Sequence, residues 1–227
     1  MNIIRIIKVP DIATIINALL GVSAIFMAIL GNVTLALIMI LMSCIADGLD
    51  GYLALHLESS QIGKYLDSLA DAISFGVAPA IIIFTIYGPE YRLLIVSVLL
   101  FYITCGILRL ARFDTKQSKI PDFEGVPITA SAVMLSSYLL MSPQYVHPYI
   151  LIFLLVLLSL LMITTYPYPK LRGTRLLLPI SVIFGLVIIS AAISHDYAPM
   201  FAALLFLLMA LYLESPIMQI PRKYYRD

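Results

Sequence analysis

Eight long apolar stretches constrain what this chain can fold into. They lie near residues 12–31, 33–56, 62–87, 91–111, 127–142, 148–167, 174–194 and 198–214. Each is close to the roughly 20 mainly apolar residues that a helix needs to cross a lipid bilayer. The chain is 62% hydrophobic and only 12% charged, so most of its outer surface must face lipid. The sequence therefore predicts an all-α integral membrane protein, one transmembrane domain over residues 1–227 with about eight spanning helices.

The basic residues predict how these helices are oriented. With the N-terminus in the cytoplasm, all 14 Lys and Arg residues except Arg92 fall at cytoplasmic ends or connections. The positive-inside rule then places both termini, and any active site, at the cytoplasmic face of a multi-pass cell-membrane protein. The first ten residues, MNIIRIIKVP, mix apolar and basic positions and predict a short interfacial segment. A net charge of +1 without a basic block excludes nucleic-acid binding.

Four aspartates stand at the facing ends of the second and third stretches. Asp47 and Asp50 are three residues apart, and Asp67 and Asp71 are four apart, so each pair projects from one face of its helix. Acids are costly in spanning segments and usually face a partner or an aqueous cavity. The four side chains are therefore expected to converge near the cytoplasmic boundary.

Converging carboxylates repel one another unless they are protonated or bind a divalent cation. Oxygen ligands without convergent Cys or His favour Mg²⁺ or Mn²⁺, and two such ions can hold a phosphate or diphosphate. Gly48, Gly51, Ala54 and Gly63 flank the acids and leave room for a phosphate or ribose, although helix packing explains small residues as well.

Residues 47–71 read DGLDGYLALHLESSQIGKYLDSLAD, which resembles the signature of the CDP-alcohol phosphotransferase family. The matching positions are Asp47, Asp50, Gly51, Ala54, Gly63, Asp67 and Asp71, whereas Leu55 stands where the family has an arginine. The resemblance implies transfer of a phosphatidyl-type group from a CDP-linked lipid to an alcohol, with release of CMP. It further implies that the four aspartates hold two Mg²⁺ or Mn²⁺ ions, that Asp71 is the general base, and that the protein is a homodimer. Gly51, Ala54 and Gly63 would then shape the CDP-lipid site.

A second region narrows the acceptor. LRLARFD at 108–114 and FEGVP at 123–127 are similar to segments of the phosphatidylserine synthases of this family, with Asp114 where an asparagine is usual. The resemblance implies L-serine as acceptor. Arg109 and Arg112 could hold its carboxylate, or a phosphate, in paired hydrogen bonds, or could simply anchor the helix end. Asn17 either lines the CDP-lipid site or makes a helix–helix hydrogen bond.

Several alternatives stay open from the sequence. The acceptor could be inositol phosphate or glycerol phosphate, which would call for a denser basic pocket. The CDP-lipid could carry diacylglycerol or an archaeal diether, because both tails look like apolar surface. The buried acids could belong to a cation transporter, or Leu55 could mark an inactive relative that only binds the CDP-lipid.

Overall fold

The chain is almost entirely helical in the computed structural model, which describes residues 6–115, 123–168, 177–193 and 197–216. The α-helices are α1 (Val9–Ile29), α2 (Val33–His56), α3 (Gly63–Asp71), α4 (Ala78–Tyr87), α5 (Arg92–Thr115), α6 (Ile128–Leu139), α7 (Pro148–Ile163), α8 (Leu177–Ile193) and α9 (Ala198–Glu214). A π-helical segment, η2 (Ala72–Val77), joins α3 to α4, and a 3₁₀ turn, η3 (Pro143–Tyr145), follows α6. All eight predicted stretches therefore contain helix, and the all-α membrane class is confirmed.

Among the described residues, four segments are long and apolar enough to cross a membrane. They are Val9–Ile29, Val33–His56, Gly63–Tyr87, which combines α3, η2 and α4, and Arg92–Thr115. The helices from α6 onward are apolar but shorter. The structure therefore bears out a multi-pass membrane protein, while a count of eight spans stays a prediction.

Local sequence explains where α1 and α2 begin and end. α1 starts at Val9, before the expected residue 12, because Pro10 suits a first helical turn and the Asp11 carboxylate accepts the main-chain N–H of Lys8 at 2.7 Å. Gly31, with φ of +82°, makes the turn into α2, where Asn32 caps the N–H of Leu35. The start of α1 thus takes up residues expected in the interfacial segment, whose residues 1–5 lie outside the described part.

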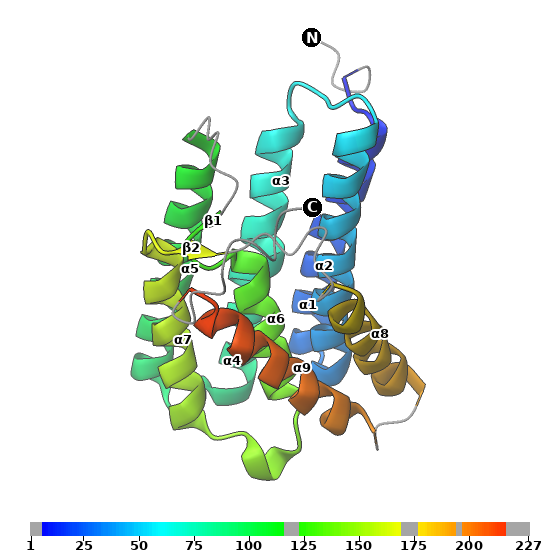
Figure 1. The fold of residues 1–227 in the computed structure, drawn as a ribbon. Coiled ribbons are helices and arrows are strands. Elements are labelled where there is room, and N and C mark those ends of the chain that lie inside the picture. Colours follow the sequence, from blue (N-terminus) through cyan, green and yellow to red (C-terminus); the bar gives the residue numbers. More distant parts are fainter. Residues whose placement is uncertain (1–5, 116–122, 169–176, 194–196, 217–227) are drawn as a thin grey trace.

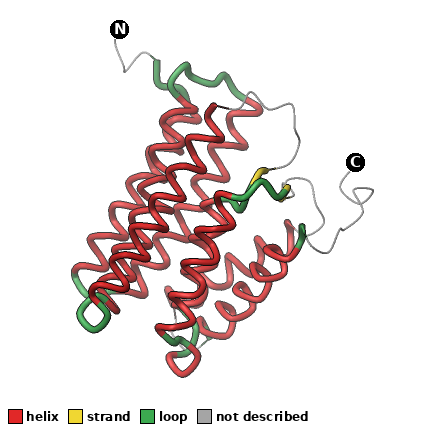
Figure 2. Tube along the Cα trace, turned by 90° about the vertical axis from the view of Figure 1, so that its left-hand side faces the viewer, coloured by secondary structure: helices red, strands yellow, loops and turns green. Residues whose placement is uncertain are grey.

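The helices pack as a bundle in which α1 lies along α2 and also contacts α3, η2 and α4 (Figure 1). Further along the chain α5 packs against α7, and α9 packs against α6 and α8. At the end where the chain begins, α1, α2, α3 and α5 extend beyond the later helices (Figure 2). The start of α6 therefore lies at an inner level of the bundle and not at its end.

Two short strands that the sequence did not predict connect the two halves of the chain. β1 (Phe123–Glu124) pairs antiparallel with β2 (Pro167–Tyr168), with Phe123 opposite Tyr168 and Glu124 opposite Pro167. The pair joins the segment before α6 to the segment after α7. It thereby holds the described segment directly before α6 against the chain that leaves α7.

Candidate active site

Three of the four aspartates meet between α2 and α3. Asp47, Asp67 and Asp71 each offer one carboxylate oxygen, and these three oxygens lie within 4.8 Å of one another. The helical spacing explains the arrangement, because residues four apart on α3 share a face and α2 presents Asp47 to that face. Two helices that are adjacent in sequence thus build an acidic cluster inside an apolar bundle.

The fourth aspartate and its neighbours are held by donors from other helices. Asp50, which is 5% exposed, accepts a hydrogen bond from Thr14 Oγ1 of α1 at 2.6 Å. Asp71, which is 7% exposed, accepts one from Asn17 Nδ2 at 3.2 Å. Asp47 accepts a longer one from Thr129 Oγ1, at the start of α6, at 3.4 Å. The carboxylates are therefore surrounded by α1, α2, α3 and α6.

The π-helical segment directly after Asp71 brings α3 close to α1. Ser74 Oγ donates to the main-chain oxygen of Asn17 at 2.9 Å, and Tyr102 of α5 donates to the main-chain oxygen of Phe75 at 2.9 Å. A Cβ on Gly21 would lie 2.7 Å from Ser74 Cα, so only glycine permits this approach. π-helical turns are frequent at functional sites, and this one sets the position of Asp71.

The acidic cluster fits a divalent cation. One oxygen of Asp67, Oδ1, is buried and has no hydrogen-bond partner among the described residues. Buried polar atoms are rarely left unpaired, and several carboxylates at short range repel one another unless a cation lies between them. Oxygen-only ligands suit Mg²⁺ or Mn²⁺.

Comparison with known proteins assigns the chain that carries this cluster to a family. Residues 7–166, which contain the whole cluster, match the family described as CDP-alcohol phosphatidyltransferase. The chain belongs to the CDP-alcohol phosphatidyltransferase family. The family resemblance of residues 47–71 is thereby confirmed, and the match ends before α8.

Individual relatives of this family agree. The chain is 35% identical over 175 residues to the archaetidylserine synthase of Methanothermobacter thermautotrophicus, covering 76% of this chain and 74% of the relative. It is 34% identical over 213 residues to the CDP-diacylglycerol–serine O-phosphatidyltransferase of Methanocaldococcus jannaschii, covering 93% and 94%. The Bacillus subtilis protein of the same name is 34% identical over 167 residues, covering 72% and 91%.

Gly48 and the small residues of the family signature have different surroundings. A Cβ on Gly63 would lie 2.9 Å from Asp11 Oδ1, so this glycine lets α3 begin close against α1. Nothing lies within 4 Å of a Cβ added to Gly48, which leaves open space on α2 near the acids. Gly51 is half-buried and Ala54 is exposed. Gly63 therefore permits the close packing of α3 on α1, whereas α2 has open space beside Gly48.

The position where this chain departs from the family signature lies at the last turn of α2. Leu55 is 67% exposed, and the neighbouring His56 stacks on Tyr52 with ring centroids 4.3 Å apart. The Nδ1 atom of His56 is 2.9 Å from the main-chain oxygen of Tyr52. The contacts of His56 are thus local to its own helix.

The two arginines expected at the acceptor side have different surroundings. Arg109 is buried at 6% exposure, and its guanidinium lies 5.6 Å from the centroid of the Phe113 ring. Arg112 donates from Nη1 to the main-chain oxygen of Ile163 at 3.0 Å. From Nη2 it donates to the main-chain oxygens of Glu124 at 2.7 Å and Met162 at 2.9 Å. Arg112 therefore ties the end of α7 and strand β1 to α5.

Sequence reasoning missed several residues around the family site. Thr14, Ser43 and Thr129 hydrogen-bond to Asp50, Asn17 and Asp47, respectively. Asp11 also escaped notice, although it accepts from Ser60 Oγ at 2.9 Å and so ties the connection between α2 and α3 to α1. The signal for two of them was the spacing of Asp11 and Thr14 with Asn17, which places the three on one face of an apolar helix.

That same connection carries an ion pair at the exposed end of the bundle. Lys8 Nζ lies 3.0 Å from Glu58 Oε2, and the hydrogen bond from Lys8 lowers the pKa of the Glu58 carboxyl. The pair is solvent-exposed, so it adds little to stability.

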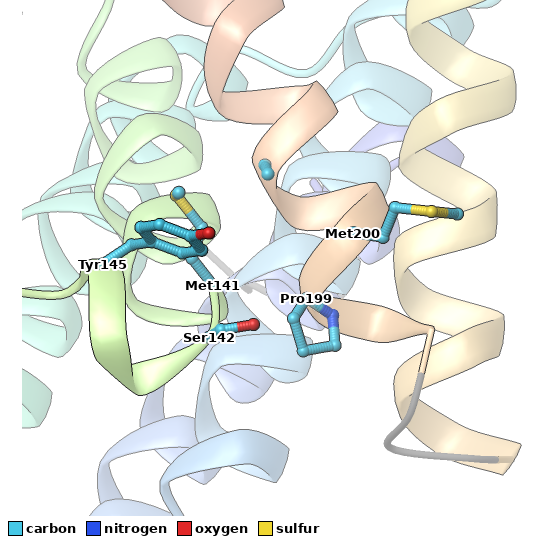
Figure 3. A pocket seen from close by; sticks show the side chains of 6 residues that line it. Met141, Ser142, Tyr145, Pro199 and Met200 are labelled. Atoms are coloured by element: carbon cyan, nitrogen blue, oxygen red, sulfur yellow. The ribbon is translucent and has the colours of Figure 1, made fainter.

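A pocket of about 400 Å³ lies at the far end of α6 from Thr129 (Figure 3). Met141, Ser142 and Tyr145 face Pro199 and Met200 of α9 across it. Apart from the Tyr145 phenol, the described residues that line it carry no titratable side chain. These described residues therefore have none of the chemistry of the acidic cluster.

Proposed function

We propose that this chain transfers a phosphatidyl-type group from a CDP-linked glycerolipid to the hydroxyl of L-serine and releases CMP. The observation that carries the proposal is the cluster of Asp47, Asp67 and Asp71, which lies at the family signature. The names of the relatives support serine as the acceptor. Both CDP-diacylglycerol and a CDP-archaeol type lipid fit the proposal, since the named relatives include both kinds of synthase.

In this proposal the four aspartates share the binding of two Mg²⁺ or Mn²⁺ ions. Asp47, Asp67 and Asp71 supply the converging oxygens, and Asp50 completes the set from the same helix as Asp47. When bound, the ions would neutralise the diphosphate of the CDP-lipid and make CMP a better leaving group. The unpaired oxygen of Asp67 is the atom that gains most from such a cation.

Asp71 is the proposed general base. Its carboxylate would take the proton of the serine hydroxyl as the serine oxygen forms a bond to the lipid-bearing phosphorus. The bond from that phosphorus to the CMP oxygen breaks, and its electron pair leaves with CMP. The deep position of Asp71, at 7% exposure, keeps bulk water from competing with the alcohol.

The remaining predicted site residues divide between donor and acceptor. Gly51, Ala54 and Gly63 would shape the nucleotide side of the CDP-lipid site, and Asn17 would act on that site through its hydrogen bond to Asp71. Arg109 would bind the serine carboxylate or a phosphate, because it is the buried cation on the helix next to the cluster. Arg112 would support the acceptor side indirectly, because its guanidinium already donates to three main-chain oxygens.

We further propose that all eight apolar segments span a cell membrane as one domain, with both termini and the acidic cluster on the cytoplasmic side, and that the protein is a homodimer. Single cysteines at Lys64 and Tyr145 should label from opposite sides of sealed vesicles, in a background with Cys44 and Cys105 replaced. Labelling of both from one side would overturn the orientation.

Cross-linking in native membranes should give a species of twice the monomer mass, and its absence would contradict the dimer.

Acceptor competition tests the proposed function. The full chain, purified in detergent with Mn²⁺, is given CDP-diacylglycerol or CDP-archaeol together with L-serine, myo-inositol 1-phosphate or sn-glycerol 3-phosphate. CMP release should depend on L-serine and continue unchanged when the polyol phosphates are added. Release only with a polyol phosphate would overturn the serine assignment. Cation flux into vesicles without any CDP-lipid would instead favour a transporter.

A further inference from the structure

A row of polar side chains runs along the face of α1 that packs on α2 and α3. Asp11, Thr14 and Asn17 are spaced three residues apart, and all three are buried. Thr14 donates to Asp50 of α2, and Asn17 donates to Asp71 of α3. Each of the two acidic pairs thus has one carboxylate that is held by a donor from α1.

The two carboxylates that α1 holds are also the more buried ones. Asp50 is 5% exposed and Asp71 is 7% exposed, whereas Asp47 and Asp67 are only half-buried. The donors from α1 thus act on the inner carboxylate of each pair, and the outer carboxylates Asp47 and Asp67 lie nearer the surface. α1 therefore supports the cluster from behind.

Asn17 is the centre of this support. Its side chain is fully buried, its Nδ2 donates to Asp71, and its Oδ1 accepts from Ser43 Oγ of α2. Its main-chain oxygen accepts from Ser74 Oγ as well. Because a hydroxyl donates to Oδ1, the amide is held with its NH₂ group toward Asp71, and the flipped amide would place an oxygen against a carboxylate.

We propose that Asn17 is a positioning residue, which holds the Asp71 carboxylate in the orientation that the acidic cluster requires, and that Ser43 fixes the orientation of the Asn17 amide. Groups that orient a metal ligand from behind commonly change metal affinity or activity by about 10- to 100-fold when they are lost. This assignment differs from a role in contacting the CDP-lipid, because both polar atoms of the Asn17 side chain are already paired within the protein. The role of Asp71 in transfer rests on the proposed function, whereas the orientation of its carboxylate does not.

The test titrates Mn²⁺ into the full chain in detergent, follows free Mn²⁺ by electron paramagnetic resonance, and measures serine-dependent CMP release in parallel. Ser43→Ala should weaken Mn²⁺ binding and lower kcat by about tenfold, with KM for serine changed by less than about twofold. Ser43→Thr, which keeps the hydroxyl, should stay within about twofold of the wild type in both. Asn17→Ala should show the larger loss of about 100-fold.

Ser159→Ala on α7 is the matched control, because it also removes a buried hydroxyl, one that among the described residues donates within its own helix, to Leu155. It should leave Mn²⁺ binding and kcat unchanged. Wild-type Mn²⁺ affinity and kcat in Ser43→Ala would overturn the proposal, and so would an equal loss in Ser43→Thr, which would indicate packing alone. If the wild type binds Mn²⁺ but releases no CMP with serine, the proposed function fails, while weaker Mn²⁺ binding by Ser43→Ala still supports the positioning role.

Discussion

Buried polar side chains behave differently in the two halves of the bundle. In α1 to α5 they bond between helices, as Thr14 does to Asp50 and Asn17 does to Asp71. In α6 and α7 the buried serines Ser137 and Ser159 bond back to their own helix, to the main-chain oxygens of Met134 and Leu155. A hydroxyl in an apolar helix can satisfy itself on the preceding turn in this way. Bonds from another helix to a carboxylate therefore mark the part of the bundle that builds the site, to which α6 contributes only its first turn through Thr129.

The largest effect should come from removing a carboxylate of the first half. Asp71→Asn keeps the size of the side chain but cannot accept the proton of the acceptor hydroxyl, so kcat for serine-dependent CMP release should fall by about 10³-fold. Glu214→Gln, which neutralises an exposed acid at the end of α9, is the matched control and should retain wild-type turnover. Turnover by Asp71→Asn close to wild type would refute the base assignment.

The next effect is the change in thermal stability when Asp67 is replaced, which should have opposite signs with and without metal. In EDTA, Asp67→Asn removes a buried carboxylate that faces its neighbours, so Tm should rise by about 2–4 °C, corresponding to about 1 kcal/mol. With saturating Mn²⁺ the wild type should gain stability and the variant much less, because its cation affinity falls by about 10- to 100-fold. Differential scanning fluorimetry in detergent measures both. A variant that is less stable than wild type in EDTA would contradict a repulsive acidic cluster.

Arg112 links the two halves, and its loss should cost stability more than chemistry. Arg112→Ala leaves three main-chain oxygens without their guanidinium donor, and unfolding free energy should fall by about 1.5–3 kcal/mol. Arg112→Lys should recover little of it, because an ammonium cannot copy the planar fork. The check is Tm compared with kcat/KM well below Tm. An intact Tm together with a greatly raised KM for serine would instead place Arg112 in the acceptor site.

The smallest effect belongs to the second half. Ser159→Ala removes the hydroxyl together with its hydrogen bond to Leu155 of the same helix, so the change in unfolding free energy should stay below about 1 kcal/mol. Thermal unfolding of Ser159→Ala beside Ser43→Ala compares the loss of unfolding free energy in the two variants. If both variants lost stability to the same degree, the distinction between the two halves would not hold.

Sequence pattern predicted the helices and the acidic cluster because both depend on local spacing. Apolar stretches of membrane length become helices, and Asp67 and Asp71 share a face because they are four residues apart. The hydrogen-bond partners of these aspartates could not be predicted from local spacing. Thr14 in an apolar helix is indistinguishable from a hydroxyl bonded to its own turn, and only the packing of α1 on α2 brings it to Asp50.

Arg112 and the π-helical segment show the same limit in another form. The spacing of Arg109 and Arg112 left open a shared ligand or an anchored helix end, but Arg112 donates to main-chain oxygens of Glu124 and Met162. Those contacts depend on the pairing of β1 with β2, which has two residues in each strand and leaves no periodic signal. The π-helical turns after Asp71 also leave no signal in the sequence, because the residues of Ala72–Val77 are typical of an ordinary apolar helix.

Metal-dependent transfer to serine is tested most directly by CMP release from a CDP-linked glycerolipid in mixed micelles. The wild-type protein is assayed in four conditions, with and without Mn²⁺ and with and without L-serine. CMP should appear only when both are present, with one equivalent of serine entering the lipid for each CMP. Equal release of CMP in EDTA would contradict a metal site at Asp47, Asp67 and Asp71. Release that is independent of serine would show hydrolysis and contradict transfer.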